Sequence, residues 1–120
     1  MVYTSYYAKL NKFPSNVVPI SISKGIPSWY IGKSYNRLAP KWDTVKKYKD
    51  GGTWEDYIHE YHETVLDLLD QREVYDELMR LSNGLDVVLL CYEKSTDNCH
   101  RHIVAECLRT VGIDCEEYKF

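Results

Sequence analysis

The segment LDVVLLCYEKSTDNCHRHIVAECL, residues 85–108, decides the fold of this chain. Its first part, Leu85–Tyr92, is a continuous apolar run of strand length, which is typical of a central strand covered on both faces. After a polar stretch, Asp97 or Asn98 can cap a helix that continues to Arg109. The segment therefore predicts a buried strand followed by a helix, and open α/β sheets usually place their ligand site at such a junction.

The rest of the sequence predicts further elements of the same class. Strands are expected where β-branched and aromatic residues gather or alternate with polar ones, over residues 2–7, 18–23 and 113–120. Helices are expected over three amphipathic stretches bounded by capping residues and glycines, residues 40–50, 53–69 and 70–82. The order ββαααβαβ predicts a single α/β domain over residues 1–120, an open α/β sandwich with a small, mostly parallel sheet and a right-handed crossover between the last two strands.

A long connection, KGIPSWYIGKSYNRLAPKWD at residues 24–43, separates the second strand from the first helix. Long loops in compact domains are often functional, so we expect ligand-binding residues in it. Lys24 directly follows a strand whose carboxyl end should meet the others at one edge of the sheet. Tyr35 and Arg37 add a flat aromatic ring beside a cation, which would suit a nucleobase or nucleotide. Four further aromatic side chains, at helical spacing, are expected in the core: Trp42, Trp54, Tyr57 and Tyr61.

Charge and hydropathy exclude several classes of protein. The chain has 120 residues and a net charge of −3, with a pI of about 5.8, whereas proteins that bind nucleic acid non-specifically are normally basic. No apolar run approaches the roughly 20 residues of a membrane span, and the first residues are too polar for a signal peptide. We therefore expect a cytoplasmic protein of a bacterium, an archaeon or a phage-infected cell, with mostly reduced thiols. The sequence leaves the oligomeric state open.

The four cysteines, at positions 91, 99, 107 and 115, follow no metal-binding motif. Because no CxxC pair is present, a structural zinc site is not predicted. The P-loop motif, which needs a glycine five residues before its Gly-Lys pair, does not occur either: Gly32-Lys33 has Pro27 at that position. The sequence therefore predicts neither a cofactor nor a metal. Cys107 and Cys115 are expected to be structural, and His59 and His62 are expected on a solvated helix flank.

Five residues at the strand–helix junction form the predicted site: Cys91, Glu93, Cys99, His100 and Arg101. The unpaired N–H groups of the first helical turn favour anions, and Arg101 would add a planar fork for phosphate or carboxylate. In the catalytic interpretation, Cys99 is the nucleophile, His100 the acid or base, Glu93 an orienting carboxylate or base, and Cys91 a strand-end thiol. In the structural interpretation, Cys91 and His100 are core residues, and Glu93 and Arg101 form an ion pair.

The chain resembles the bacterial, archaeal and phage proteins grouped as domain of unknown function 488. The resemblance covers most of the chain, and its residues are the strand VVLLCYEK (Val87–Lys94), the Cys99-His100-Arg101 triplet with the helix HIVAECL, and the earlier segments VYTSYYAK and Leu38-Ala39-Pro40. The pattern Cys-x-Glu followed by Cys-His-Arg is fairly specific. The resemblance implies a three-layer Rossmann-like fold and no particular activity.

One departure limits what the resemblance implies. Longer members often carry an Asp-x-Arg motif at the end of the second strand, where this chain has Ser21-Ile22-Ser23 followed by Lys24. Functional residues are therefore carried over from the family only at the five junction residues.

Three hypotheses about function follow. The first is an enzyme, or a former enzyme, that binds or processes a small anionic ligand, nucleotide-like or phosphorylated, at the Cys-His-Arg helix terminus. The second is a non-catalytic module that senses or sequesters a nucleotide, for example in phage–host conflict. The third is a thiol-based metal or redox site that uses Cys91, Cys99 and His100.

Overall fold

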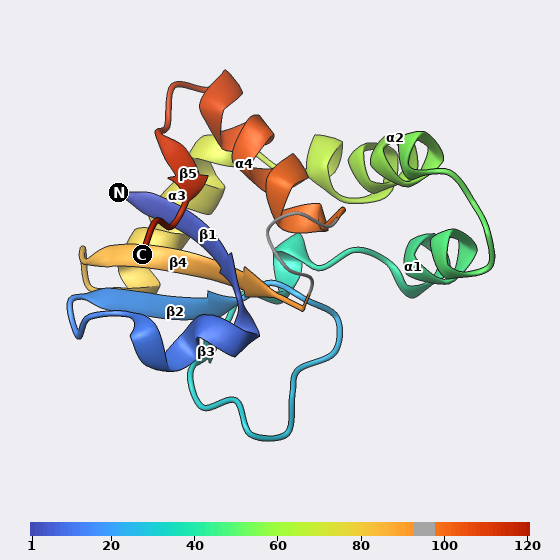
Figure 1. Ribbon diagram of the computed structural model, residues 1–120. Coiled ribbons are helices and arrows are strands. Elements are labelled where there is room, and N and C mark those ends of the chain that lie inside the picture. Colours follow the sequence, from blue (N-terminus) through green and yellow to red (C-terminus); the bar gives the residue numbers. More distant parts are fainter. Residues whose placement is uncertain (93–97) are drawn as a thin grey trace.

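A computed structural model describes residues 1–92 and 98–120, and its centre is one five-stranded sheet (Figure 1). The strand order is β3-β2-β4-β1-β5, and every neighbouring pair is parallel. The strands are β1 (Val2–Tyr6), β2 (Val17–Ser21), β3 (Lys33–Ser34), β4 (Asp86–Cys91) and β5 (Cys115–Glu117). Central β4 is buried from Val87 to Cys91, as its apolar run predicted. The predicted α/β, Rossmann-like class is confirmed.

Four α-helices accompany the sheet: α1 (Trp42–Lys49), α2 (Trp54–Thr64), α3 (Gln71–Leu81) and α4 (His100–Thr110). Residues of α2, α3 and α4 form the main core with one face of the sheet, to which β4 contributes Val87 and Leu89. Helices α1 and α2 lie beyond the carboxyl ends of β2 and β4 (Figure 1). These two helices therefore stand next to the edge at which the sequence predicts the site.

The other face of the sheet carries a thinner layer. Val88 and Leu90 of β4 pack there against Tyr7 at the start of a 3-10 helix, η1 (Tyr7–Lys12), and against Phe13 and Tyr30. The alternation of side chains along β4 explains why successive residues enter different cores. The third layer of the sandwich thus consists of η1 and loop residues.

Several elements differ from the predictions. The connection after β2 contains the short strand β3, which pairs with Ile20 and Ser21, and the 3-10 helix η2 (Asn36–Leu38). The helix predicted over residues 53–69 ends at Thr64 because Val65 leaves the helical region, with φ −133° and ψ −65°, and a 3-10 turn, η3 (Leu66–Leu68), follows. Helix α4 begins with Cys99 as its N-cap, without a side-chain cap hydrogen bond, so the prediction of Asn98 as the cap is wrong. The alternative cap, Asp97, lies outside the described residues.

The four aromatic residues predicted as core have different environments. Tyr57 and Tyr61 are buried, whereas Trp54 is half-buried and Trp42 is 54% exposed. The prediction for Trp42 is wrong because the short helix α1 turns Thr44 inward instead. None of the helices in the described residues combines the length and the apolar character that a membrane span requires.

Candidate functional site

A cavity of about 470 Å³ lies at the carboxyl ends of β2 and β4 and is bounded by α1, α2 and the start of α4. Its wall is largely aromatic and its floor carries sulfur and imidazole. Among the described residues that line it, the charged ones are Lys24 and Lys49, which are both positive. The aromatic residues are Trp42, Tyr48, Trp54, Tyr57 and Tyr92, and the floor consists of Cys91, Cys99 and His100.

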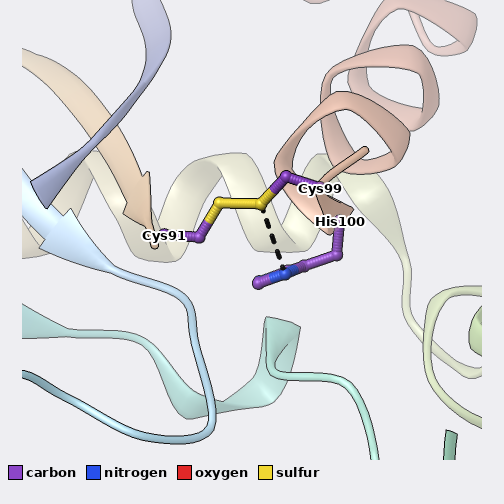
Figure 2. Close-up of side chains that lie close together, drawn as sticks. All are labelled: Cys91, Cys99 and His100. Atoms are coloured by element: carbon purple, nitrogen blue, oxygen red, sulfur yellow. Dashed lines mark hydrogen bonds between the residues drawn. A yellow bond between two sulfur atoms is a disulfide. The ribbon is translucent and has the colours of Figure 1, made fainter. Parts of the chain in front are cut away.

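Cys91 and Cys99 are joined by a disulfide in the structure (Figure 2). Cys91 ends β4 and Cys99 is the N-cap of α4, so the bond ties the sheet to the helix that follows it. Both residues are almost completely buried, with relative exposures of 0% and 2%. The sequence left open whether Cys91 and Cys99 come close enough to bond, and the structure joins them, whereas Cys107 and Cys115 are free.

His100 is held in one tautomer by the backbone. Its Nε2 lies 2.7 Å from the carbonyl oxygen of Ile22, which can only accept, so Nε2 carries the proton and Nδ1 carries a lone pair. Nδ1 lies 3.9 Å from Sγ of Cys99. Burial lowers the pKa of His100 to about 4, since the positive ring would lose its hydration, and nearby Arg101 acts in the same direction. At neutral pH the imidazole is therefore uncharged and its lone pair faces sulfur.

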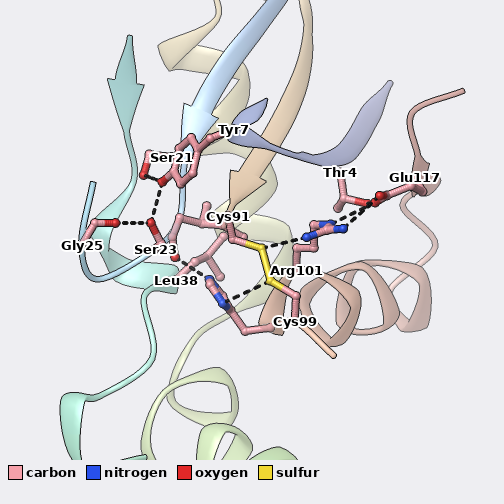
Figure 3. Close-up of a disulfide and its surroundings, with 12 residues drawn as sticks. Thr4, Tyr7, Ser21, Ser23, Gly25, Leu38, Cys91, Cys99, Arg101 and Glu117 are labelled. Carbon is pink, nitrogen blue, oxygen red and sulfur yellow. Dashed lines mark hydrogen bonds and ion pairs between the residues drawn. A yellow bond between two sulfur atoms is a disulfide. The ribbon is translucent and has the colours of Figure 1, made fainter. Parts of the chain in front are cut away.

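The guanidinium of Arg101 is completely buried and bonded inside the protein (Figure 3). Its Nε and Nη2 donate to the two carboxylate oxygens of Glu117, each at 3.1 Å, and Nη1 donates to Sγ of Cys91, also at 3.1 Å. Glu117 accepts a further hydrogen bond from Thr4 at 2.6 Å. The sequence assigned the Arg101 guanidinium to the phosphate or carboxylate of a ligand, but in the structure it binds the Glu117 carboxylate of β5. Arg101 is not among the described residues that line the cavity.

The other predicted ligand-binding residues lie in three different places. Lys24 lines the cavity, as its position after β2 suggested. Tyr35 is buried in the main core, and Arg37 forms ion pairs on the surface with Glu73 and Glu77 of α3. Glu93 lies outside the described residues. The structure therefore brings together Lys24, Cys91, Cys99 and His100, and it places Tyr35 and Arg37 elsewhere.

A hydrogen-bonded network shapes the rim near Lys24. The hydroxyl of Tyr7 bonds to the hydroxyls of Ser21 and Ser23, and Ser23 donates to the carbonyl oxygen of Gly25 (Figure 3). The Tyr7 ring also makes an edge contact with Tyr92, with the ring centroids 5.0 Å apart. This network fixes the backbone on both sides of Lys24.

The sequence missed two groups of residues. Three of the aromatic lining residues, Trp42, Trp54 and Tyr57, were assigned to the core because their helical spacing is the same as that of a packed helix face. Glu117 was missed because it lies 16 residues beyond Arg101, and its partner becomes apparent only when β5 is placed beside β1.

Comparison with known proteins gives a family. No curated protein and no solved structure matches the chain significantly. A family model described as the active DUF488-N3 subclade matches residues 15–112, which is most of the chain and includes β2, β4 and α4. The chain therefore belongs to the family of domain of unknown function 488.

Proposed function

We propose that the protein binds a small anionic ligand with a flat ring, such as a nucleotide, in the cavity at the carboxyl ends of β2 and β4. The observation that carries this proposal is the combination of an aromatic wall with two lysines in one cavity. Its volume of about 470 Å³ falls within the range of roughly 300–1,000 Å³ that is usual for small-molecule sites.

Each part of the cavity has a role in this proposal. Trp42 and Trp54, which are exposed and half-buried respectively, offer ring faces for stacking with a base. Lys24 and Lys49 both line the cavity and supply charge for a phosphate. The first turn of α4 adds backbone N–H groups and the positive end of the helix dipole.

The proposal also gives Cys99 and His100 a chemical role once the disulfide is reduced. The neutral imidazole presents Nδ1 to Sγ of Cys99 at 3.9 Å, so in this proposal it orients the thiol as a nucleophile. Because burial lowers the pKa of His100 to about 4, the proton of the thiol goes to solvent and not to the imidazole. The description of the matched subclade as active supports this enzymatic version.

Calorimetric titration of the intact protein tests the binding proposal. We expect adenosine or guanosine monophosphate to bind more tightly than the corresponding nucleoside or inorganic phosphate. We also expect Lys24→Gln and Lys49→Gln each to weaken binding about 5- to 20-fold, because a charge-assisted hydrogen bond contributes about 1–2 kcal/mol. Lys46→Gln is the matched control, since Lys46 is an exposed lysine of α1 that is not among the described lining residues. Binding that is unchanged in the Lys24→Gln/Lys49→Gln double variant would refute the proposal.

A second candidate function is a module that binds the ligand without transforming it. Two observations favour it: the sulfurs of Cys91 and Cys99 are bonded to each other, and the Arg101 fork is filled by Glu117. Incubation of the reduced protein with the bound nucleotide, followed by chromatography, separates the two functions. Recovery of unchanged ligand supports the binding module, and a product that disappears in Cys99→Ser supports the enzyme.

A further inference from the structure

The floor of the cavity combines three side chains that are typical ligands of a soft divalent metal. We propose that in its dithiol state the protein binds a zinc-type ion through Sγ of Cys91, Sγ of Cys99 and Nδ1 of His100. The three ligand atoms lie within 4.8 Å of one another, and all three residues are buried. The site does not depend on the proposed nucleotide binding and would exist without it.

The spacing between imidazole and sulfur fits one shared ion. In tetrahedral zinc sites the metal–sulfur distance is about 2.3 Å and the metal–nitrogen distance about 2.0 Å, which puts the two ligand atoms roughly 3.5 Å apart. Nδ1 of His100 and Sγ of Cys99 are 3.9 Å apart. The two sulfurs are bonded to each other in the structure, so they must be reduced and separate before both can bind metal.

The surroundings of the three residues match those of metal ligands. A metal-binding histidine almost always donates its other ring N–H to a carbonyl or carboxylate, which fixes its tautomer and orientation. His100 has this arrangement, because Nε2 donates to the carbonyl oxygen of Ile22 at 2.7 Å and leaves Nδ1 toward the sulfurs. The guanidinium of Arg101, 3.1 Å from Sγ of Cys91, stabilises negative charge on that sulfur.

The charges of the three ligands favour binding of a divalent ion at this buried site. Two thiolates and a neutral imidazole around a divalent ion carry no net charge, so burial of the complex costs less than burial of a bare ion. Thiolate and imidazole ligands together favour zinc over magnesium or calcium, which prefer oxygen. With three protein ligands, a tetrahedral ion would keep a fourth position for water or another ligand, and all three residues line the cavity. Such an open position is usual in catalytic rather than structural zinc sites.

Formation of the site requires reduction, and a small thiol supplies it. Two thiol molecules reduce the protein disulfide: the S–S bond breaks, each cysteine gains one electron and one proton, and the reductant leaves as its own disulfide. Binding of the divalent ion then releases the two cysteine protons. The oxidised protein is accordingly the metal-free form.

Cobalt is a suitable probe, because Co²⁺ bound to thiolates has charge-transfer absorption and its visible bands report tetrahedral geometry. The protein is reduced with a small dithiol, freed of it under inert gas and titrated with Co²⁺ and then with Zn²⁺. We expect one ion per chain, tetrahedral bands, displacement of cobalt by zinc and release of two protons per ion. We expect the oxidised protein to bind neither ion. This comparison needs no substitution, and Cys107 and Cys115 are free in both forms.

Variants locate the ion. Cys91→Ser and Cys99→Ser should each remove the charge-transfer absorption and weaken binding more than about 100-fold, whereas the Cys107→Ser/Cys115→Ser variant should bind like the wild type. Far-UV circular dichroism checks that each variant is folded. The proposal is overturned if the reduced wild-type protein has four titratable thiols but takes up no metal. It is equally overturned if metal binding survives in folded Cys91→Ser or Cys99→Ser, or if the oxidised protein binds as well as the reduced one.

Discussion

At the scale of single residues, the neighbours His100 and Arg101 differ in position: His100 lines the cavity, and Arg101 is not among the described lining residues. The His100 ring lines the cavity and bonds to the backbone of the loop after β2. Arg101 points to the other side of α4 and joins β5 to the end of β4 (Figure 3). We therefore expect His100 to affect chemistry and pH dependence, and Arg101 to affect mainly the stability of the fold.

The pKa of His100 predicts how stability depends on pH. In the unfolded chain the pKa is 6.5 and in the folded protein it is about 4, so the unfolded state binds the proton more readily. This contribution to stability is complete above pH 6.5 and is lost as pH falls toward 4, by at most about 3 kcal/mol. His100→Gln, which keeps a donor for Ile22, should flatten the pH dependence in urea denaturation. The exposed His59→Gln is the control, and equal slopes in both variants would show that His100 is not the group responsible.

We expect substitution of Arg101 to lower the stability of the fold strongly. Arg101→Met leaves the Glu117 carboxylate without its bidentate partner and removes the contact with Cys91. Breaking a buried ion pair costs about 3–5 kcal/mol, and because the Glu117 side chain is 29% exposed, we expect about 2–4 kcal/mol. Urea denaturation measures the change, with the exposed Arg80→Met as a control that should stay within about 0.5 kcal/mol. A loss below 1 kcal/mol would contradict this account.

At the scale of elements, the sequence predicts best where its pattern is long and regular. The apolar run of β4 is continuous and the apolar stripe of α4 is regular, so both elements were predicted. The N-cap of α4 is Cys99 and not the predicted Asn98. β3 has only two residues, Lys33 and Ser34, and exists because it pairs with β2, which no local pattern reveals. The site follows the same rule. Cys91, Cys99 and His100 are close in sequence, and the structure places them together in the cavity lining. The aromatic residues of α1 and α2 reach the cavity only through tertiary packing.

The turn between α1 and α2 sets the position of the aromatic wall. A Cβ on Gly52 would lie 2.8 Å from the carbonyl oxygen of Lys47, too close to fit without movement of the backbone. Gly52→Ala should therefore destabilise the protein by about 1–3 kcal/mol and weaken ligand binding, because both helices contribute to the lining. In Gly25→Ala the nearest atom to the new Cβ is 3.9 Å away, so its unfolding free energy should hardly change. Equal stabilities of the two variants would show that the turn is not tightly constrained.

At the scale of the whole molecule, the disulfide joins the sheet to the helical layer. Cys91 ends the central strand, and Cys99 begins the helix that packs on β1 and β4 and leads to β5. The same bond lies on the floor of the cavity. The redox state of this pair should therefore affect both the global stability and the chemistry of the site.

Reduction should lower the stability of the metal-free protein. The bond closes a segment with a sequence separation of 8, and constraining a loop of this length in the unfolded chain contributes about 2–3 kcal/mol. Urea denaturation with and without a reductant measures this difference, and the Cys107→Ser/Cys115→Ser variant should show the same one because it keeps the bonded pair. Zinc added to the reduced protein should recover part of the loss, since an ion that binds only the folded state stabilises it by mass action. If the reduced protein were as stable as the oxidised one, the disulfide would not contribute to the free energy of unfolding. If added zinc also caused no change, the two sulfurs would not hold a metal ion that stabilises the fold.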